Sequence, residues 1–223
     1  MKTWLLVAAE RREFGGLLRH LGPGARLKWS GAKFAREVRW KGNRWWLLAN
    51  GPGPELAAKA LEIGAKREEV NAVISTGLCG ALDPALRVGD IVVAGVAPVV
   101  SRPYTSGDMH SLTTVAVTAR DKRVLRNQTG AVAVDMETAA VRKQAATWKI
   151  PSFCVRAVSD TAGDNLPLDF NRYRNTRGDF SRSKIALAAI AHPITTMPRL
   201  LHFDRDCRFA AKALGDFLAD CQF

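Results

Sequence analysis

The stretch AVISTGLCG, residues 72–80, is a compact apolar run that leads directly into two closely spaced glycines. Its first five residues, 72–76, predict a strand buried on both faces, because such strands read as short apolar runs rich in Val and Ile. The glycines that follow, Gly77 and Gly80, predict a turn where this strand ends. A fully buried strand implies a central sheet that is covered by helices.

The segments on both sides of this stretch alternate between strand and helix patterns. Predicted strands cover residues 3–9, 35–40, 44–49, 91–94, 131–134 and 153–158. Predicted helices cover residues 11–20, 55–63, 137–147, 184–190 and 198–218. This alternation is typical of an α/β domain with a largely parallel sheet. We therefore expect one domain over residues 1–223, a three-layer α/β fold whose mixed, mostly parallel central sheet is flanked by helices.

The composition is that of a globular protein with a strong positive charge. Hydrophobic residues make up 47% of the 223 residues, and 33 Lys and Arg against 21 Asp and Glu give a net charge of +12. Such a charge attracts anionic surfaces or phosphate ligands. The apolar runs fall short of the roughly 20 residues of a membrane span, and no signal peptide is recognised, so we expect a cytoplasmic protein. Four widely spaced cysteines predict core residues, without a disulfide framework or a metal site.

Residues that could bind a ligand or take part in a reaction follow three of the predicted strands. Gly77 comes after the first strand discussed, Asp135-Met136-Glu137 after the strand at 131–134, and Ser159-Asp160 after the strand at 153–158. Ligands of open α/β sheets bind at the carboxyl ends of the strands. The sequence therefore predicts a binding site where these three strand ends meet.

These residue types suit the cleavage of a bond between a purine and a ribose. That reaction passes through an oxocarbenium-like sugar and needs an acid for the leaving base. A strand-end Asp160 kept partly protonated by burial can be that acid, and Glu137 can accept hydrogen bonds from a ribose 2′,3′-diol. A glycine-rich turn lets a ligand approach the backbone. The alternatives are a helix-capping or turn role for Asp160 and a first-turn role for Glu137.

Fragments of the chain, taken in order, resemble the purine nucleoside phosphorylase and methylthioadenosine/adenosylhomocysteine nucleosidase superfamily, and the resemblance covers residues 1–164. The fragments are NGPG at 50–53 with the following Ala57-Ala58, GLCGAL at 77–82, VGDIVV at 88–93, VDME at 134–137 and VRAVSD at 155–160. The resemblance implies a phosphorylase/hydrolase-like fold, a purine nucleoside substrate and a homo-oligomer. It implies no cofactor, with phosphate as an optional co-substrate.

The resemblance also assigns roles to single residues. Asp160 matches the acid that protonates purine N7, and Ser159 matches the neighbour that helps to place it. Glu137 matches the ligand of the ribose diol, and Met136 matches a residue that packs against the sugar. Arg156 matches an arginine near the acid that gives structural support.

The chain departs from its hydrolytic relatives in two places. In those enzymes the first strand ends in an acidic run that supplies the carboxylate orienting water, whereas here Arg12 stands at the matching position. Either Glu10 or Glu13 can take over that role, and the sequence leaves the choice open. Leu78, directly after Gly77, stands where hydrolytic relatives often have Ser, which makes that part of the pocket more apolar.

The nucleophile is predicted to be water rather than phosphate. Hexameric bacterial phosphorylases carry an Arg where this chain has Gly89, and they carry a Gly-Asp-Pro-x-Arg motif near the N-terminus that this sequence lacks. Arg87 or Arg102 could still bind phosphate, so phosphorolysis stays open as an alternative.

A narrower resemblance concerns the segment 96–136, which is short, and the tail from residue 192 onward. Both look like the hopanoid-associated phosphorylase-like subgroup, which implies release of adenine from adenosylhopane. The basic, amphipathic extension at about 184–223 is then predicted to touch an anionic membrane surface. The alternative is a C-terminal helix that packs on the sheet with its arginines in water.

Three further alternatives remain at this stage. The substrate can be a small soluble nucleoside such as methylthioadenosine or futalosine. The positive charge and the six tryptophans also fit a nucleic-acid-binding protein, although the motifs above make nucleic acid an unlikely partner. The irregular Glu10–Glu13 region is compatible with an inactive family member that only binds.

Overall fold

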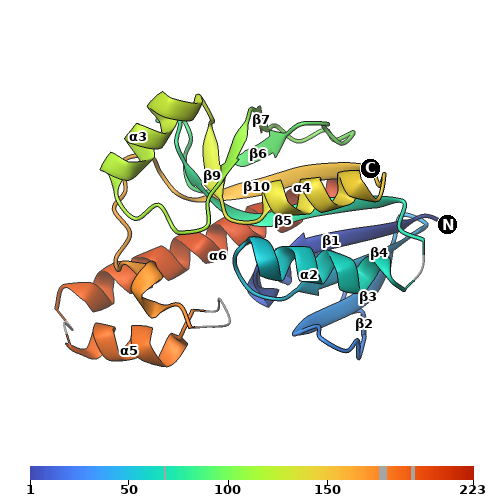
Figure 1. The fold of residues 1–223 in the computed structure, drawn as a ribbon, viewed down its shortest axis with the longest axis horizontal. Coiled ribbons are helices and arrows are strands. Elements are labelled where there is room, and N and C mark those ends of the chain that lie inside the picture. Colours follow the sequence, from blue (N-terminus) through green and yellow to red (C-terminus); the bar gives the residue numbers. More distant parts are fainter. Residues whose placement is uncertain (68, 176–179, 192–193) are drawn as a thin grey trace.

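The computed structural model describes residues 1–67, 69–175, 180–191 and 194–223 (Figure 1). The strands are β1 Thr3–Ala8, β2 Ala25–Arg26, β3 Phe34–Trp40, β4 Asn43–Ala49, β5 Ala72–Ala81, β6 Ile91–Ala94, β7 Thr105–Ser106, β8 Met109–Ser111, β9 Ala133–Asp135 and β10 Ser152–Asp160. The α-helices are α1 Gly15–Leu21, α2 Pro54–Ala65, α3 Ala119–Thr129, α4 Thr138–Thr147, α5 Arg182–Ala191 and α6 Thr196–Asp220. Two 3₁₀ turns, η1 Arg11–Phe14 and η2 Phe170–Tyr173, complete the described elements.

The strands form one mixed sheet with a parallel centre. Its order is β2-β3-β4-β1-β5-β10-β6-β7, and β9 pairs with β5 while β8 pairs with β9. The central strands β4, β1, β5 and β10 are parallel to one another. Antiparallel pairs join β3 to β4, β6 to β10 and β9 to β5. The predicted mixed, mostly parallel sheet is confirmed.

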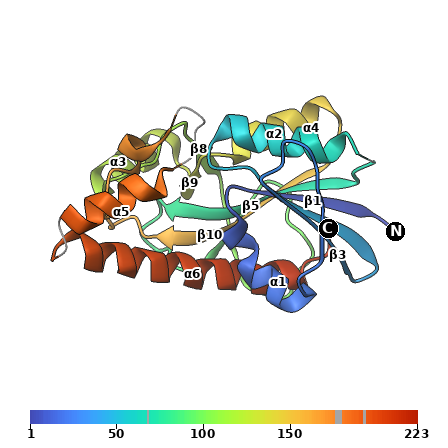
Figure 2. The same ribbon diagram turned by 90° about the horizontal axis from the view of Figure 1, so that it is seen from below.

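Helices cover both faces of the sheet, as Figure 2 shows with α2 and α4 on one side and α1 and α6 on the other. The alternation of side chains along β1 explains this arrangement, because successive residues of a strand point to opposite faces. Leu6 packs in the cluster that contains Leu214 of α6, whereas Leu5 packs in the cluster that contains Leu61 of α2. The predicted three-layer α/β fold is confirmed by this packing.

The parallel centre brings several strand ends to one end of the molecule. In Figure 2 the arrows of β5 and β10 point toward the end that carries α5, and both chain termini lie at the opposite end. Segments that follow β1 and β4 reach the same region, because both strands run parallel to β5. Glu137, which follows the antiparallel strand β9, meets the segment after β4 through the backbone N–H of Gly53. This end is therefore where a site is expected in such a sheet.

The prediction of a glycine turn after residue 76 is wrong. The strand β5 continues to Ala81, because Gly77–Cys79 pairs with β10 and Gly80–Ala81 pairs with β9. Pairing with neighbours that are distant in sequence overrides the local turn signal. In the same way, β10 runs through Asp160, so that residue lies at the end of a strand and does not cap a helix.

Other boundaries differ from the predicted ones. The helix after β9 starts at Thr138, with Glu137 at its N-cap position, and the first helix opens with the 3₁₀ turn η1. The last two helices are longer than predicted at 184–190 and 198–218. The sequence patterns missed α3 and the short strands β2, β7 and β8. By contrast, β6 has the predicted bounds, residues 91–94.

The second half of α6 belongs to the core. Leu214, Phe217 and Leu218 are fully buried against the sheet and α1. The predicted membrane-facing segment would need these three side chains to be exposed, so they cannot contact a membrane. Among the described helices, none combines the length and the apolar character needed to cross a membrane.

Candidate functional site

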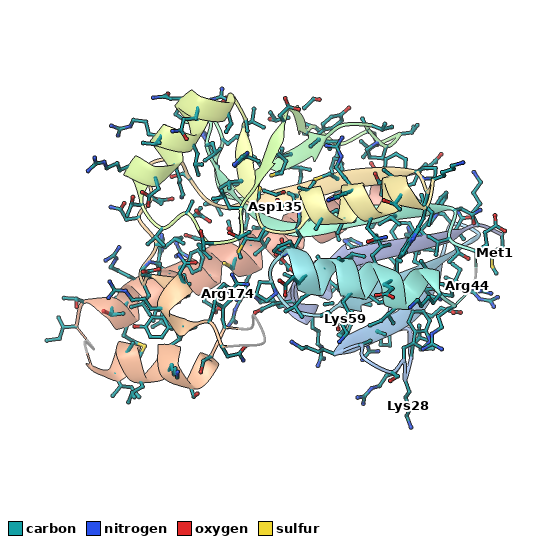
Figure 3. All side chains as sticks on the ribbon, viewed as in Figure 1. Met1, Lys28, Arg44, Lys59, Asp135 and Arg174 are labelled. Carbon is teal, nitrogen blue, oxygen red and sulfur yellow. The ribbon has the colours of Figure 1, made fainter. Side chains whose placement is uncertain are left out.

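A fully buried arginine on β10 pairs with two carboxylates at the end of β9, those of Asp135 and Glu137. Arg156 on β10 places Nη2 2.7 Å from Asp135 Oδ2 and donates to Ser75 Oγ at 3.0 Å. Its Nη1 donates to the carbonyl oxygen of Thr76 at 2.8 Å. Both Arg156 and the Asp135 side chain are fully buried, and a buried ion pair of this kind is stable only when further hydrogen bonds satisfy both groups. Figure 3 labels Asp135 near the middle of the molecule, close to the start of α4.

Glu137 connects this arginine to the glycine-rich segment that precedes α2. Its Oε2 lies 3.6 Å from Arg156 Nη2, and its Oε1 accepts a hydrogen bond of 2.8 Å from the backbone N–H of Gly53. Burial raises the pKa of Glu137 to about 7, although the positive charge of Arg156 acts in the opposite direction. A carboxylate that can titrate near neutral pH therefore lies at the N-cap of α4.

Glu13 reaches the same cluster from η1. Its Oε1 accepts the backbone N–H of Leu78 at 2.9 Å, and its Oε2 accepts the backbone N–H of Glu10 at 2.6 Å. Gly77, with φ +138°, makes this approach possible. A Cβ at Gly77 would lie 2.6 Å from both Glu13 Oε1 and Arg156 Nη1. Burial raises the pKa of Glu13 above its ordinary value.

Asp160 occupies the end of β10, three pairs further along β5 than Arg156. Its Oδ1 lies 2.7 Å from Ser159 Oγ, and that hydroxyl can donate either to it or to the Cys79 carbonyl oxygen at 3.1 Å. Its Oδ2 lies 2.5 Å from Nζ of Lys122, whose side chain is fully buried. Asp160 is therefore one half of a buried ion pair rather than an isolated buried acid.

The structure brings most of the predicted site residues together. One contact network includes Glu13, Gly77, Leu78, Glu137 and Arg156. Met136 lies beside this network, since its Cε would be 3.8 Å from a Cβ placed on Gly53.

Two predicted residues have different surroundings from those expected. The Glu10 side chain pairs with Arg12 at 2.9 Å, and Glu10 joins the network through its backbone N–H, which donates to Glu13 Oε2. The ion-pair partners of Arg156 are Asp135 and Glu137, so its support goes to those carboxylates and not to Asp160.

Two residues of the site escaped the sequence analysis. Asp135 was noticed only as part of a strand end, yet it is the main partner of Arg156. Lys122 lies within the segment 96–136, where the sequence analysis assigned it no role, yet its ammonium holds Asp160. A helix signal for that region was present, because Thr118 and Asp121 form a capping box at the start of α3. The sequence carried no signal for the buried ion pair.

Two cavities adjoin the glycine-rich segment at 51–54. The larger, about 840 Å³, is bordered by Ala9, Gly51 and Pro52 and combines aromatic residues with several basic ones. The smaller, about 420 Å³, is lined by Pro52, Gly53 and Arg174 among others. Figure 3 shows Arg174 beside the start of α2. Open space therefore lies beside the glycine-rich segment that Glu137 contacts through the Gly53 N–H.

The sequence of this chain is similar to a known family and to known enzymes. A family model described as the Phosphorylase superfamily matches residues 6–97 and 94–191. The 5′-methylthioadenosine/S-adenosylhomocysteine nucleosidase of Colwellia psychrerythraea is 26% identical over 175 residues, which are 58% of this chain and 72% of that protein. The nucleosidase of the same name from Mycobacterium tuberculosis is 25% identical over 187 residues, covering 57% and 73%.

Solved structures share the fold at low sequence identity. The 5′-methylthioadenosine/S-adenosylhomocysteine nucleosidase of Neisseria meningitidis superposes with a TM-score of 0.72, covering 99% of this chain and 98% of that one at 21% identity. Futalosine hydrolase of Helicobacter pylori superposes with a TM-score of 0.72, covering 97% and 95% at 15% identity. These likenesses establish the fold.

Proposed function

The chain belongs to the Phosphorylase superfamily, and from this membership we propose that it hydrolyses the N-glycosidic bond of a 5′-substituted purine ribonucleoside. Its relatives include methylthioadenosine/S-adenosylhomocysteine nucleosidases, which supports cleavage of an N-glycosidic bond as its reaction. The observation that carries the proposal is the meeting of Glu13, Glu137 and Arg156 around Gly77, three strand pairs from Asp160 along β5 and β10.

We assign the roles as follows. Glu137, anchored by Arg156 and Gly53, accepts hydrogen bonds from the ribose 2′- and 3′-hydroxyls. Asp160 donates a proton to purine N7 as the C1′–N9 bond breaks and its electron pair goes to the base. Ser159 fixes one oxygen of Asp160. Met136 lies against the sugar.

Water is the proposed nucleophile and Glu13 the base that orients it. Glu13 is buried within the network and held by two backbone N–H groups, so its position is fixed before a substrate binds. Its raised pKa favours the acceptance of a proton from water. Arg87 and Arg102, the candidate phosphate ligands, are both exposed on the surface, which supports hydrolysis over phosphorolysis.

The 5′ substituent is proposed to be small, as in methylthioadenosine or futalosine. Support comes from the relatives, which include enzymes named for methylthioadenosine and for futalosine.

Adenosylhopane is a second candidate substrate, favoured by one observation. Apolar side chains are exposed on α5 and around the start of α6. In Figure 2, α5 lies at the end of the molecule toward which β5 and β10 point. The exposed apolar side chains are Leu187, Ile190, Ile194 and Leu201. Exposed Lys184 and Arg199 lie in the same segments, so this region suits contact with an anionic lipid surface.

The test is base release from adenosine, methylthioadenosine, futalosine and an adenosylhopane-like lipid, each with and without phosphate. We expect release from a small nucleoside without phosphate. Release from the lipid alone, together with flotation on anionic vesicles, would favour the second candidate. A strict requirement for phosphate would contradict hydrolysis, and no release from any substrate would contradict the whole proposal.

A further inference from the structure

A lysine with no exposed surface reaches the carboxylate of the proposed general acid. Lys122 is the only residue of α3 that is buried in the described structure, and its side chain has no exposed area. Nζ lies 2.5 Å from Asp160 Oδ2. A lysine is almost never fully buried unless its charge is paired, so this position is built around the contact with Asp160.

The other hydrogens of the ammonium are also used. Nζ donates to the carbonyl oxygen of Thr161 at 2.7 Å and lies 3.3 Å from that of Asp164. The turn at 161–164 is closed by the Asp164 carboxylate, which accepts from the Thr161 N–H and hydroxyl, both at 2.7 Å. Lys122 therefore joins α3 to the end of β10 and to the turn that follows it.

The two oxygens of Asp160 thus have different partners. Oδ2 meets an ammonium and Oδ1 meets the Ser159 hydroxyl. Two fixed partners from different elements hold the carboxyl group in one orientation. A buried cation at this distance also stabilises the carboxylate, because opposite charges interact strongly where water is excluded.

We propose that Lys122 is the positioning residue of the general acid, which it orients and whose ionised form it stabilises once the proton has left. This inference rests on the proposed function. In the step concerned, the C1′–N9 bond breaks and its electron pair goes to the purine. A proton that Asp160 has taken from solvent moves to N7, and Asp160 remains as a carboxylate paired with Lys122. The water oxygen bonds to C1′, and its proton goes to Glu13.

If Lys122 has this role, its replacement should affect substrates differently according to their leaving group. Adenine leaves only with help from the acid, so its release depends on Asp160 and on Lys122. The 4-nitrophenolate of 4-nitrophenyl β-D-ribofuranoside leaves without a proton, so its release uses the ribose site and the nucleophile alone. A merely structural lysine would affect both substrates alike.

The test compares kcat and KM of wild type, Lys122→Gln and Lys122→Arg on adenosine or methylthioadenosine and on the nitrophenyl riboside. The glutamine keeps hydrogen-bond donors for the carbonyl groups of the turn but has no charge. The arginine keeps the positive charge, but its guanidinium group cannot occupy the same position as the lysine ammonium. Arg123→Gln, which removes an exposed cation of the same helix, is the matched control. Circular dichroism establishes that each variant is folded.

We expect Lys122→Gln to lower kcat for adenine release by about 10²-fold, within the range of a general acid, with KM changed less than about 3-fold. Nitrophenol release should stay within about 3-fold of wild type, and Lys122→Arg should recover part of the adenine rate. If the glutamine variant does not fold, the same difference between adenine release and nitrophenol release can be measured with the arginine variant. Equal losses on both substrates, or no loss on either, would overturn the role of Lys122. A wild-type protein inactive on every substrate would instead overturn the proposed function.

Discussion

Glu13 Oε1 accepts a 2.9 Å hydrogen bond from the backbone N–H of Leu78, although the two residues are 65 positions apart in the chain. The hydrogen bond joins the turn after β1 to the middle of β5. It needs a glycine at position 77, because a side chain there would collide with Glu13. The sequence left open whether Glu10 or Glu13 orients the water, and this contact favours Glu13. Glu13 is buried in the network, while Glu10 faces Arg12.

Replacing each of these two glutamates separately tests that choice. We expect Glu13→Gln to lower kcat for nucleoside hydrolysis by about 10²–10³-fold, because the amide cannot accept a proton from water. Glu10→Gln is the matched control and should stay within about 3-fold of wild type. Steady-state kinetics on one nucleoside decides between them. A larger loss in the Glu10 variant would assign the base to Glu10.

Glu137 should give the protein a pH dependence near neutrality. Its pKa is raised to about 7, chiefly by burial, so the ionised form that accepts two ribose hydroxyls is lost as the pH falls below about 7. We expect kcat/KM for a ribonucleoside to fall on that side of a pH profile. The corresponding 2′-deoxyribonucleoside should be cleaved poorly at every pH, and equal cleavage of the two would contradict the role.

The same group gives a readout independent of activity. A carboxyl whose pKa is higher in the folded than in the unfolded state stabilises the fold fully below its unfolded pKa, and this contribution is lost as the pH rises through about 7. Glu137→Gln removes the titration. Urea unfolding should therefore show the variant gaining stability relative to wild type between pH 5 and pH 8. A constant difference over that range would argue against the raised pKa.

Much of the fold was predictable because apolar periodicity reports burial. The strand β6 is a short apolar run, and its bounds were predicted correctly. The helix α3 was missed for the opposite reason, since its buried residue is Lys122 and most of its other residues are polar. The strand β5 was ended too early because the pairing of Gly80 and Ala81 with β9 joins segments more than 50 residues apart.

The candidate site shows the same division. Glu137 and Asp160 follow apolar strands, so the position of each in the sequence indicated a strand end. Their partners are set by tertiary packing. Nothing near residue 122 in the sequence indicates a carboxylate at residue 160, and burial of a charge is visible only once the fold has placed both groups.

Arg156 should matter for stability as much as for function. Replacing it with Met leaves the Asp135 carboxylate buried beside Glu137 without a cation, and breaking a buried pair costs about 3–5 kcal/mol. We expect urea unfolding of Arg156→Met to show a loss of this size. Lys143→Met, which removes an exposed cation from α4, should change stability by less than about 0.5 kcal/mol. The double variant Arg156→Met/Asp135→Asn should recover part of the loss, and a double variant less stable than the single one would contradict the pairing.

Asp160→Asn tests the acid itself. The amide keeps the shape of the side chain and can still contact Lys122 and Ser159, but it cannot pass a proton to N7. We expect kcat for adenine release to fall by about 10²–10⁴-fold, while the fold persists by circular dichroism and 4-nitrophenyl riboside is still cleaved at close to the wild-type rate. Unimpaired release of adenine would show that another group is the acid. Equal losses on both substrates would place Asp160 among the residues that hold the ribose, so this comparison separates protonation of the base from recognition of the sugar.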